Sequence, residues 1–117
     1  MTIQETAQTI AAILDSKKGI DIEVIDVKGK TTLADYFVIA SGSSVTQVKA
    51  MADEVAYVLS KEHQIEPDHV EGNNRDHWIL LDYLDVVVHI FLEEERHLYS
   101  LEKLWSGQYQ RPVSETD

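Results

Sequence analysis

The sequence predicts a two-layer α+β fold, in which one mixed β-sheet carries helices mainly on one of its faces. Apolar residues recur at helical spacing in two separate segments, and strand-like apolar runs lie before and after the second one. The chain has 117 residues, about the size of one domain, and 44% of them are hydrophobic. Because no internal repeat or linker divides it, we expect a single domain over residues 1–107 and a disordered tail over residues 108–117.

The first segment predicts a helix followed by a half-exposed strand. Thr2 and Glu5 have the spacing of a capping box, so we expect the helix to begin there. Residues 17–19 are two lysines and a glycine, which are typical of a helix end with a left-handed cap. Apolar and acidic residues alternate over residues 20–24, which predicts a half-exposed strand before a turn at residues 28–30.

The second segment predicts a buried strand and a long helix. Residues 36–40 are continuously apolar, as in a strand that is buried on both faces inside a sheet. Ser44 and Gln47 again have capping-box spacing at the start of the helix. This helix is expected to pack across the sheet through an apolar stripe formed by Val45, Val48, Ala52, Val55 and Leu59.

The C-terminal half predicts a loop, a hairpin and a last helix. Residues 63–77 are polar and contain proline and glycine, so we expect a loop with a short edge strand near Val70. Residues 78–82 and 86–91 are two strands joined at Tyr83 and Leu84. The expected order is helix, strand, strand, helix, strand, strand, helix, and the last helix carries Leu98, Leu101, Leu104 and Trp105.

Composition limits the classes of function. The absence of cysteine excludes disulfides, thiolate metal sites and thiol nucleophiles. The chain has 21 Asp and Glu residues and 10 Lys and Arg residues, which gives a formal charge of −11. This charge repels nucleic acid and attracts a basic partner protein. The alternative is that the acidic surface only keeps the protein soluble. The sequence shows no secretory signal and no apolar run of the ~20 residues that a membrane span needs, so we expect a cytoplasmic protein that does not bind membranes.

Two groups of residues suggest enzymatic chemistry. The turn Ser41-Gly42-Ser43 lies between a strand and a helix start, where backbone N–H groups can bind phosphate, and this arrangement resembles the nucleotidyltransferase fold. That fold needs two metal-binding carboxylates on the next strand, which this chain lacks. Asp82 and Asp85 flank a turn, where aspartate commonly bonds its own backbone, and partner contact or metal binding are the alternatives. We expect His89 to be a hydrogen-bonded structural imidazole rather than a catalytic base, and we expect no cofactor or metal.

Trp78 and Tyr83 are the strongest candidates for partner binding, because aromatic residues on short strands beside a loop can anchor protein interfaces. Strand alternation places Trp78 on one face with Leu80 and Asp82, and places Tyr83 on the other face. A face that carries Asp82 is expected to meet solvent rather than the core. Trp78 is therefore predicted to be available to a partner, with core burial as the alternative.

Several motifs together resemble the bacterial ribosomal silencing factor, or iojap-related, family. The similarity extends from the first helix to Trp105, and the combined spacing of the motifs is specific although each fragment alone is weak. The motifs are DYFVIASG from Asp35, VKA from Val48, ADEV from Ala52, Glu71-Gly72, Trp78, LDY from Leu81, DVVVHIF from Asp85 and LYSLEKLW from Leu98.

The resemblance implies a nucleotidyltransferase-like fold without demonstrated catalysis, and therefore a protein that is not an enzyme. Members of the family bind the large ribosomal subunit through its fourteenth protein, at the face where the small subunit docks. This blocks subunit joining and represses translation when nutrients are short. Organellar relatives act in ribosome assembly, and relatives can form a homodimer that competes with ribosome binding. The alternative function is a nucleotide-binding or nucleotidyltransferase enzyme that uses the Ser41-Gly42-Ser43 turn.

The resemblance also implies a set of contact residues. The family often has glycine where this chain has Leu84, and a positive φ in a two-residue turn strains leucine, so we expect the turn type to differ here. The contact residues carried over to this chain are Trp78, Tyr83 and Asp85, with Leu81, Asp82 and Lys49 as further candidates.

Overall fold

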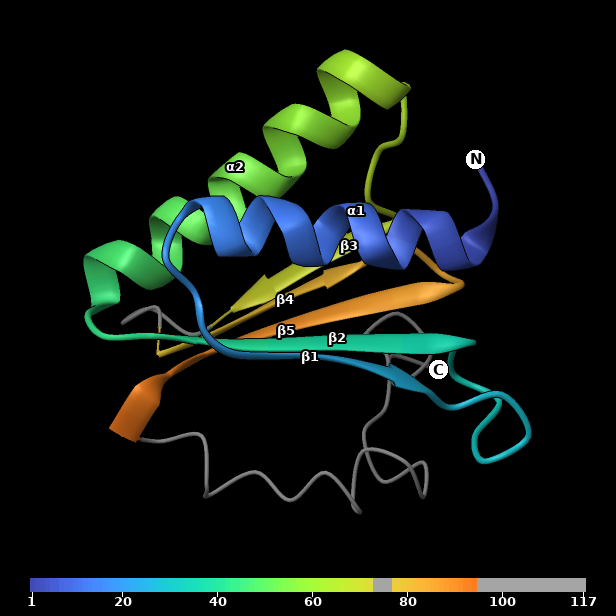
Figure 1. Cartoon of the computed structure of the whole chain (residues 1–117), viewed down its shortest axis with the longest axis horizontal. Helices are drawn as coiled ribbons and strands as arrows, with labels where there is room; N and C mark the ends of the chain where they lie inside the picture. The colour runs from blue at the N-terminus through green and yellow to red at the C-terminus, as the bar shows by residue number, and fades with distance from the viewer. Residues whose placement is uncertain (73–76, 95–117) are drawn as a thin grey trace.

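The computed structural model describes residues 1–72 and 77–94 of the chain. Two helices lie on the same side of a five-stranded sheet, as Figure 1 shows, which confirms the predicted two-layer α+β fold. The helix expected around Leu98 and the tail expected at residues 108–117 lie outside the described residues. The elements are α1 (Ile3–Ser16), β1 (Ile20–Asp26), β2 (Tyr36–Gly42), α2 (Val45–His63), β3 (His69–Gly72), β4 (Trp78–Asp82) and β5 (Val86–Leu92).

The sheet is mixed, and its strand order is β1-β2-β5-β4-β3. β2 and β5 pair in parallel, and the other neighbouring strands pair antiparallel. The parallel connection crosses over through α2, as a parallel pair requires. β3 is the short edge strand that the sequence predicts near Val70.

Helix α1 begins at the predicted capping box. The Thr2 hydroxyl accepts the Glu5 N–H at 3.0 Å, and the Glu5 carboxylate accepts the Thr2 N–H at 2.8 Å. This bond from the Thr2 backbone lowers the pKa of Glu5, because it stabilises the charged carboxylate.

The end of α1 differs from the prediction. The left-handed residue is Lys18, with φ 64°, and not Gly19. Gly19 is needed for space instead, since a Cβ there would lie 3.0 Å from the carbonyl oxygen of Leu14 and 3.1 Å from the Met51 side chain. Close packing of the helix end against α2, rather than backbone handedness, explains this glycine.

Helix α2 also departs from the prediction in two details. Ser44 caps the helix, because its hydroxyl accepts a hydrogen bond from the Gln47 N–H at 3.1 Å. The Gln47 side-chain oxygen does not complete a capping box with the Ser44 backbone. It accepts instead from the Ser43 N–H and hydroxyl, at 2.6 and 2.8 Å. The expected stripe included Val45, which is 36% exposed, and omitted Met51, which is fully buried. Val45 is the first residue of the helix.

Two apolar clusters cover the two faces of the sheet. The larger lies between the helices and the sheet, and the smaller lies on the opposite face around Phe37 and Phe91. Leu80, Asp82 and His89 are fully buried on that opposite face, so the expectation that Asp82 marks a solvent-exposed face is wrong. The physical reason is that β2 and β5 are apolar on both sides, and alternate side chains of these strands must also be buried there.

His89 is part of this smaller cluster. Its ring lies edge-on to Phe37 at 5.1 Å and nearly parallel to Phe91 at 6.1 Å between ring centroids. Complete burial lowers the pKa of His89 to about 3, because an apolar environment disfavours the charged imidazolium.

This burial predicts a pH-dependent stability. The folded protein keeps His89 neutral, whereas the unfolded chain binds a proton below about pH 6.5, so the free energy of unfolding falls as the pH drops below 6.5. The contribution of His89 is up to about 1.4 kcal/mol per pH unit. Urea denaturation between pH 7 and pH 5 should show this slope, and His89→Leu should remove it. A control variant, His63→Gln on α2, should keep the slope; equal slopes in all three proteins would contradict the prediction.

Gly42 is predicted to be intolerant of a side chain. A Cβ at this position would lie 2.9 Å from the Val48 side chain and 3.1 Å from the Val48 backbone nitrogen. Gly42→Ala should therefore lower the free energy of unfolding by about 1–3 kcal/mol, since the start of α2 must move. Gly29→Asn is the control, because Gly29 has φ 78°, which asparagine tolerates, and a Cβ there would meet nothing within 4 Å. Equal melting temperatures for Gly42→Ala and the wild type would refute the steric argument.

Candidate protein-interaction surface

The structure divides the six candidate contact residues between the two faces of the sheet. Lys49 projects from α2, and Leu81 faces the helices from β4. Tyr83 and Asp85 follow at the end of β4 and line one pocket together. On the opposite face, Trp78 packs against the smaller cluster and Asp82 is buried.

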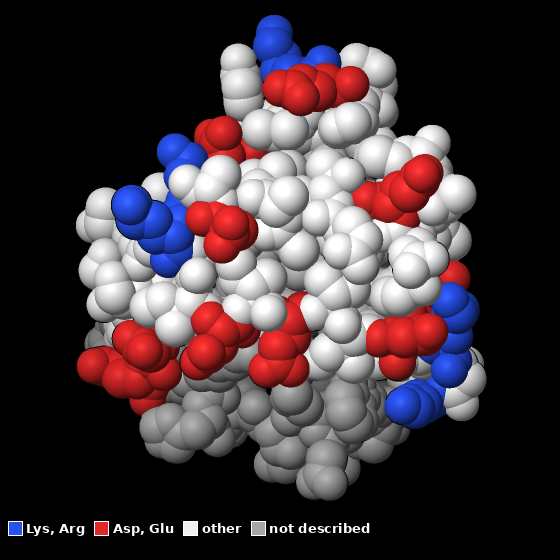
Figure 2. Space-filling view, viewed as in Figure 1, with Lys and Arg blue, Asp and Glu red and all other residues white. Residues whose placement is uncertain are grey.

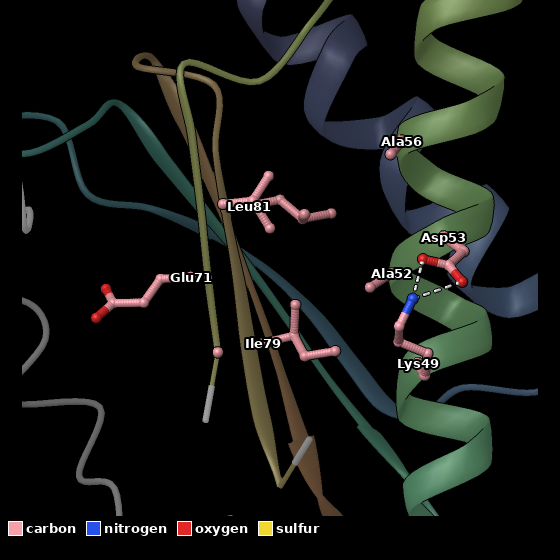
Figure 3. Close-up of a pocket in the computed structure, with 9 residues that line it drawn as sticks. Lys49, Ala52, Asp53, Ala56, Glu71, Ile79 and Leu81 are labelled. Atoms are coloured by element: carbon pink, nitrogen blue, oxygen red, sulfur yellow. Dashed lines mark hydrogen bonds and ion pairs between the residues drawn. The ribbon is translucent and has the colours of Figure 1, made fainter. Parts of the chain in front are cut away.

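A groove of about 390 Å³ separates α2 from β3 and β4. In Figure 3, Ile79 and Leu81 point from the sheet towards α2. Both are almost fully buried, so the floor of the groove is apolar. The Lys49 ammonium bonds both oxygens of the Asp53 carboxylate at 2.8 and 2.9 Å on the helix wall.

The groove borders the open edge of the sheet. Among the described strands, β3 pairs only with β4, and Val70 stands opposite Leu81 in this pairing. The Val70 side chain is 52% exposed. Sequence reasoning missed Val70 as a contact candidate, although an isolated β-branched residue in a polar loop was a usable signal. It also missed Ile79, whose place on the groove floor depends on strand pairing.

A second, smaller pocket of about 210 Å³ lies at the end of β4 and involves Tyr83 and Asp85. The Tyr83 side chain is 9% exposed, and burial, followed by the negative charge of Glu66, raises its pKa to about 12. The phenol therefore stays protonated at neutral pH.

The turn after β4 is held in a strained conformation. Leu84 has φ 73°, and the Asp85 N–H bonds the Tyr83 carbonyl at 2.9 Å, which makes a γ-turn centred on Leu84. The buried Asp82 carboxylate accepts the Leu84 N–H at 2.8 Å. This confirms that Asp82 bonds the backbone of its own turn, and it gives Asp82 the role of positioning Tyr83 and Asp85.

Trp78 is half-buried at the start of β4. Its ring lies nearly parallel to the rings of His89 and Phe91, with centroids 6.4 and 6.3 Å apart. The indole therefore supports the smaller cluster and leaves part of its surface accessible.

The serine turn before α2 gives no support to the enzyme alternative. Ser41 is buried, and Ser43 and Ser44 bond Gln47 at the start of the helix. In the part of the chain that the structure describes, no three His, Asp or Glu side chains lie close enough to hold a metal ion. Neither helix within those same ranges has the length and apolar character that a bilayer span requires.

Negative charge is distributed widely over the surface. Figure 2 shows acidic side chains across the visible face, with the basic ones in small groups near its margins. Ion pairs within residues 1–72 and 77–94 include those between Lys28 and Asp26 and between Lys49 and Asp53.

Comparison with known proteins identifies the family. The model of the family described as "ribosomal silencing factor during starvation" matches residues 1–117. The chain belongs to the ribosomal silencing factor family. Members of this family are ribosomal silencing factors, which are regulatory proteins and not enzymes.

Individual relatives cover almost the whole chain. A ribosomal silencing factor from Halalkalibacterium halodurans is 41% identical over 90% of this chain and 89% of its own length. A crystal structure of a protein from Chromobacterium violaceum has a TM-score of 0.83 and 38% identity, and covers 95% of this chain and 92% of that protein. A mouse protein named mitochondrial assembly of ribosomal large subunit protein 1 is 34% identical over 83% of this chain and 43% of its own length.

The γ-turn predicts that glycine is the better residue at position 84 of this silencing-factor chain. Leu84→Gly should raise the free energy of unfolding by about 0.5–1 kcal/mol, because glycine relieves the positive-φ strain and the leucine side chain is already 53% exposed. Leu84→Ala is the matched control, since alanine removes the same side chain but keeps the Cβ that causes the strain. Thermal denaturation of the three proteins checks this; a gain for alanine equal to that for glycine would contradict it.

Proposed function

We propose that this chain represses translation by binding the large ribosomal subunit through its fourteenth protein and blocking the joining of the small subunit. The observation that carries the proposal is the family match over the full chain, to a family described by silencing during starvation. The mouse relative, whose name refers to assembly of the large ribosomal subunit, supports that subunit as the target. The repression would act in the cytoplasm under nutrient limitation.

Steric occlusion suits the architecture. A rigid folded domain on the joining face prevents docking of the small subunit without any chemical step. The serine turn is engaged in helix capping, and this supports a binding function over the nucleotidyltransferase alternative.

We assign the partner contacts to the surface formed by the groove, the β3 edge and the turn after β4. Lys49, Leu81, Tyr83 and Asp85 border this surface directly, and Val70 adds an exposed apolar side chain. In this proposal Asp82 acts through the turn, and Trp78 contacts a partner that reaches around the sheet edge. A homodimer formed through the same surface would compete with ribosome binding.

Charge favours a basic partner. A net charge of −11 speeds the encounter with a basic ribosomal protein, while apolar contacts in the groove supply most of the affinity once the complex forms. Binding should therefore weaken as salt increases, since salt screens exposed charges beyond roughly 10 Å at 0.1 M.

Co-sedimentation with separated ribosomal subunits tests the proposal. We expect the purified protein to sediment with large subunits and not with small subunits, and we expect large subunits preincubated with it to form fewer joined ribosomes. The small-subunit fraction is the control for non-specific adhesion. Binding without any loss of joined ribosomes would overturn the occlusion mechanism, and absence of binding to large subunits would overturn the proposed target.

A further inference from the structure

The hydroxyl of Tyr83 is the least satisfied polar group beside the proposed contact surface. It is buried and has no hydrogen-bond partner among the described residues, and the whole side chain is 9% exposed. A buried polar group without a partner is unfavourable, so this hydroxyl does not stabilise the fold. A phenylalanine would fill the same space without that cost.

The Tyr83 side chain lines the pocket of about 210 Å³ at the end of β4, which we call the Tyr83 pocket, and its hydroxyl is buried next to this pocket. The walls combine apolar side chains with polar groups in similar proportion, and Asp85 is exposed at the turn. No lysine or arginine side chain of the described ranges lines it, and Met1, which carries the α-amino group, does. Its lining residues are Met1, Ile3, Thr6, Ile65, Tyr83, Asp85 and Val86.

The chemistry of the pocket favours a positively charged group. The main-chain carbonyl of Asp85 accepts hydrogen bonds from the N–H groups of Asp35 and Tyr36 at 2.9 and 3.1 Å. These bonds hold the backbone of the turn that carries the Asp85 carboxylate. The charge of Glu66 also acts on the Tyr83 hydroxyl, as the raised pKa of Tyr83 indicates. The Asp85 carboxylate, which belongs to the pocket lining, would repel an anionic group.

We propose that the Tyr83 pocket binds one lysine or arginine side chain of a basic protein partner. Its aliphatic stem lies along Ile3, Ile65 and Val86, and its charged head donates hydrogen bonds to the Tyr83 hydroxyl oxygen and the Asp85 carboxylate. Long basic side chains are suited to such sites, because the stem is apolar and only the head is charged. The inference rests on the proposed function for the identity of the partner, but not for the chemistry of the pocket.

The test uses two substitutions that remove single groups. Tyr83→Phe removes the hydroxyl alone, and Asp85→Asn removes the charge alone. Each has a matched control: Tyr57→Phe on α2, where Tyr57 is 60% exposed, and Asp15→Asn at the far end of α1, where Asp15 is exposed. The dissociation constant for purified large ribosomal subunits and the melting temperature are measured for all five proteins.

We expect Tyr83→Phe to weaken binding by about tenfold or more, because a hydrogen bond to a charged group is lost. Its melting temperature should stay the same or rise, which a purely structural role of the hydroxyl would not produce. Asp85→Asn should weaken binding similarly and reduce its salt dependence, and both controls should bind like the wild type. If wild type binds and Tyr83→Phe and Asp85→Asn bind equally well, the pocket inference is overturned while the proposed function stands.

A second measurement does not depend on the ribosome. N-acetyl-arginine methylamide is titrated into the labelled protein, and the methyl resonances of Ile3, Ile65 and Val86 are followed by NMR. We expect these resonances to shift in the wild type, to shift less in Tyr83→Phe, and not to respond to the neutral citrulline analogue. The inference that the pocket binds a cation would be overturned by the absence of shifts up to the solubility limit of the arginine probe, or by equal shifts with citrulline. This result does not depend on whether the protein binds large subunits.

Discussion

The parallel pairing of β2 with β5 is the constraint on which the rest of the structure depends. Every residue of these two strands is buried, so both faces of the sheet must be covered at its centre. The helices cover one face, and the ring cluster around Phe37, His89 and Phe91 fills the other. A parallel pair also requires a long crossover, and α2 supplies it while packing on the sheet. Burial of His89 and Asp82 follows from this arrangement rather than from their own chemistry.

The two edges of the sheet are treated differently, and this places the proposed interaction surface. β1 carries exposed acidic side chains and a register shift between Ile20 and Glu23, with Asp21 at φ 49°, features that discourage another strand from pairing there. β3 is short but presents Val70 beside an apolar groove. The β3 edge and the neighbouring end of α2 are therefore the part of the described surface best suited to a protein partner.

The occlusion that we propose would need a stable, well-positioned surface and no reactive group. The turn after β4 meets this need at a cost in backbone strain at Leu84, and the buried Asp82 carboxylate holds that strained peptide in place. A similar balance applies to Tyr83, whose hydroxyl is buried and has no hydrogen-bond partner in the described part of the chain. A buried polar group without a hydrogen bond destabilises the free protein. When a partner supplies that hydrogen bond, the recovered free energy contributes to the affinity of the complex.

Local patterns in the sequence were enough to predict α1, α2 and the strands, because capping residues and apolar periodicity act over a few neighbouring residues. They also predicted that Asp82 would bond its own turn. Alternation correctly separated Trp78 from Tyr83, but it does not reveal what covers each face, so the burial of Asp82 was missed. Other features depend on contacts between segments distant in the chain. These are the packing of Gly19 against Met51, the groove beside Val70 and the pocket that joins Tyr83 to Ile3 and Ile65. Such contacts are set by how the helices pack on the sheet, which no local pattern encodes.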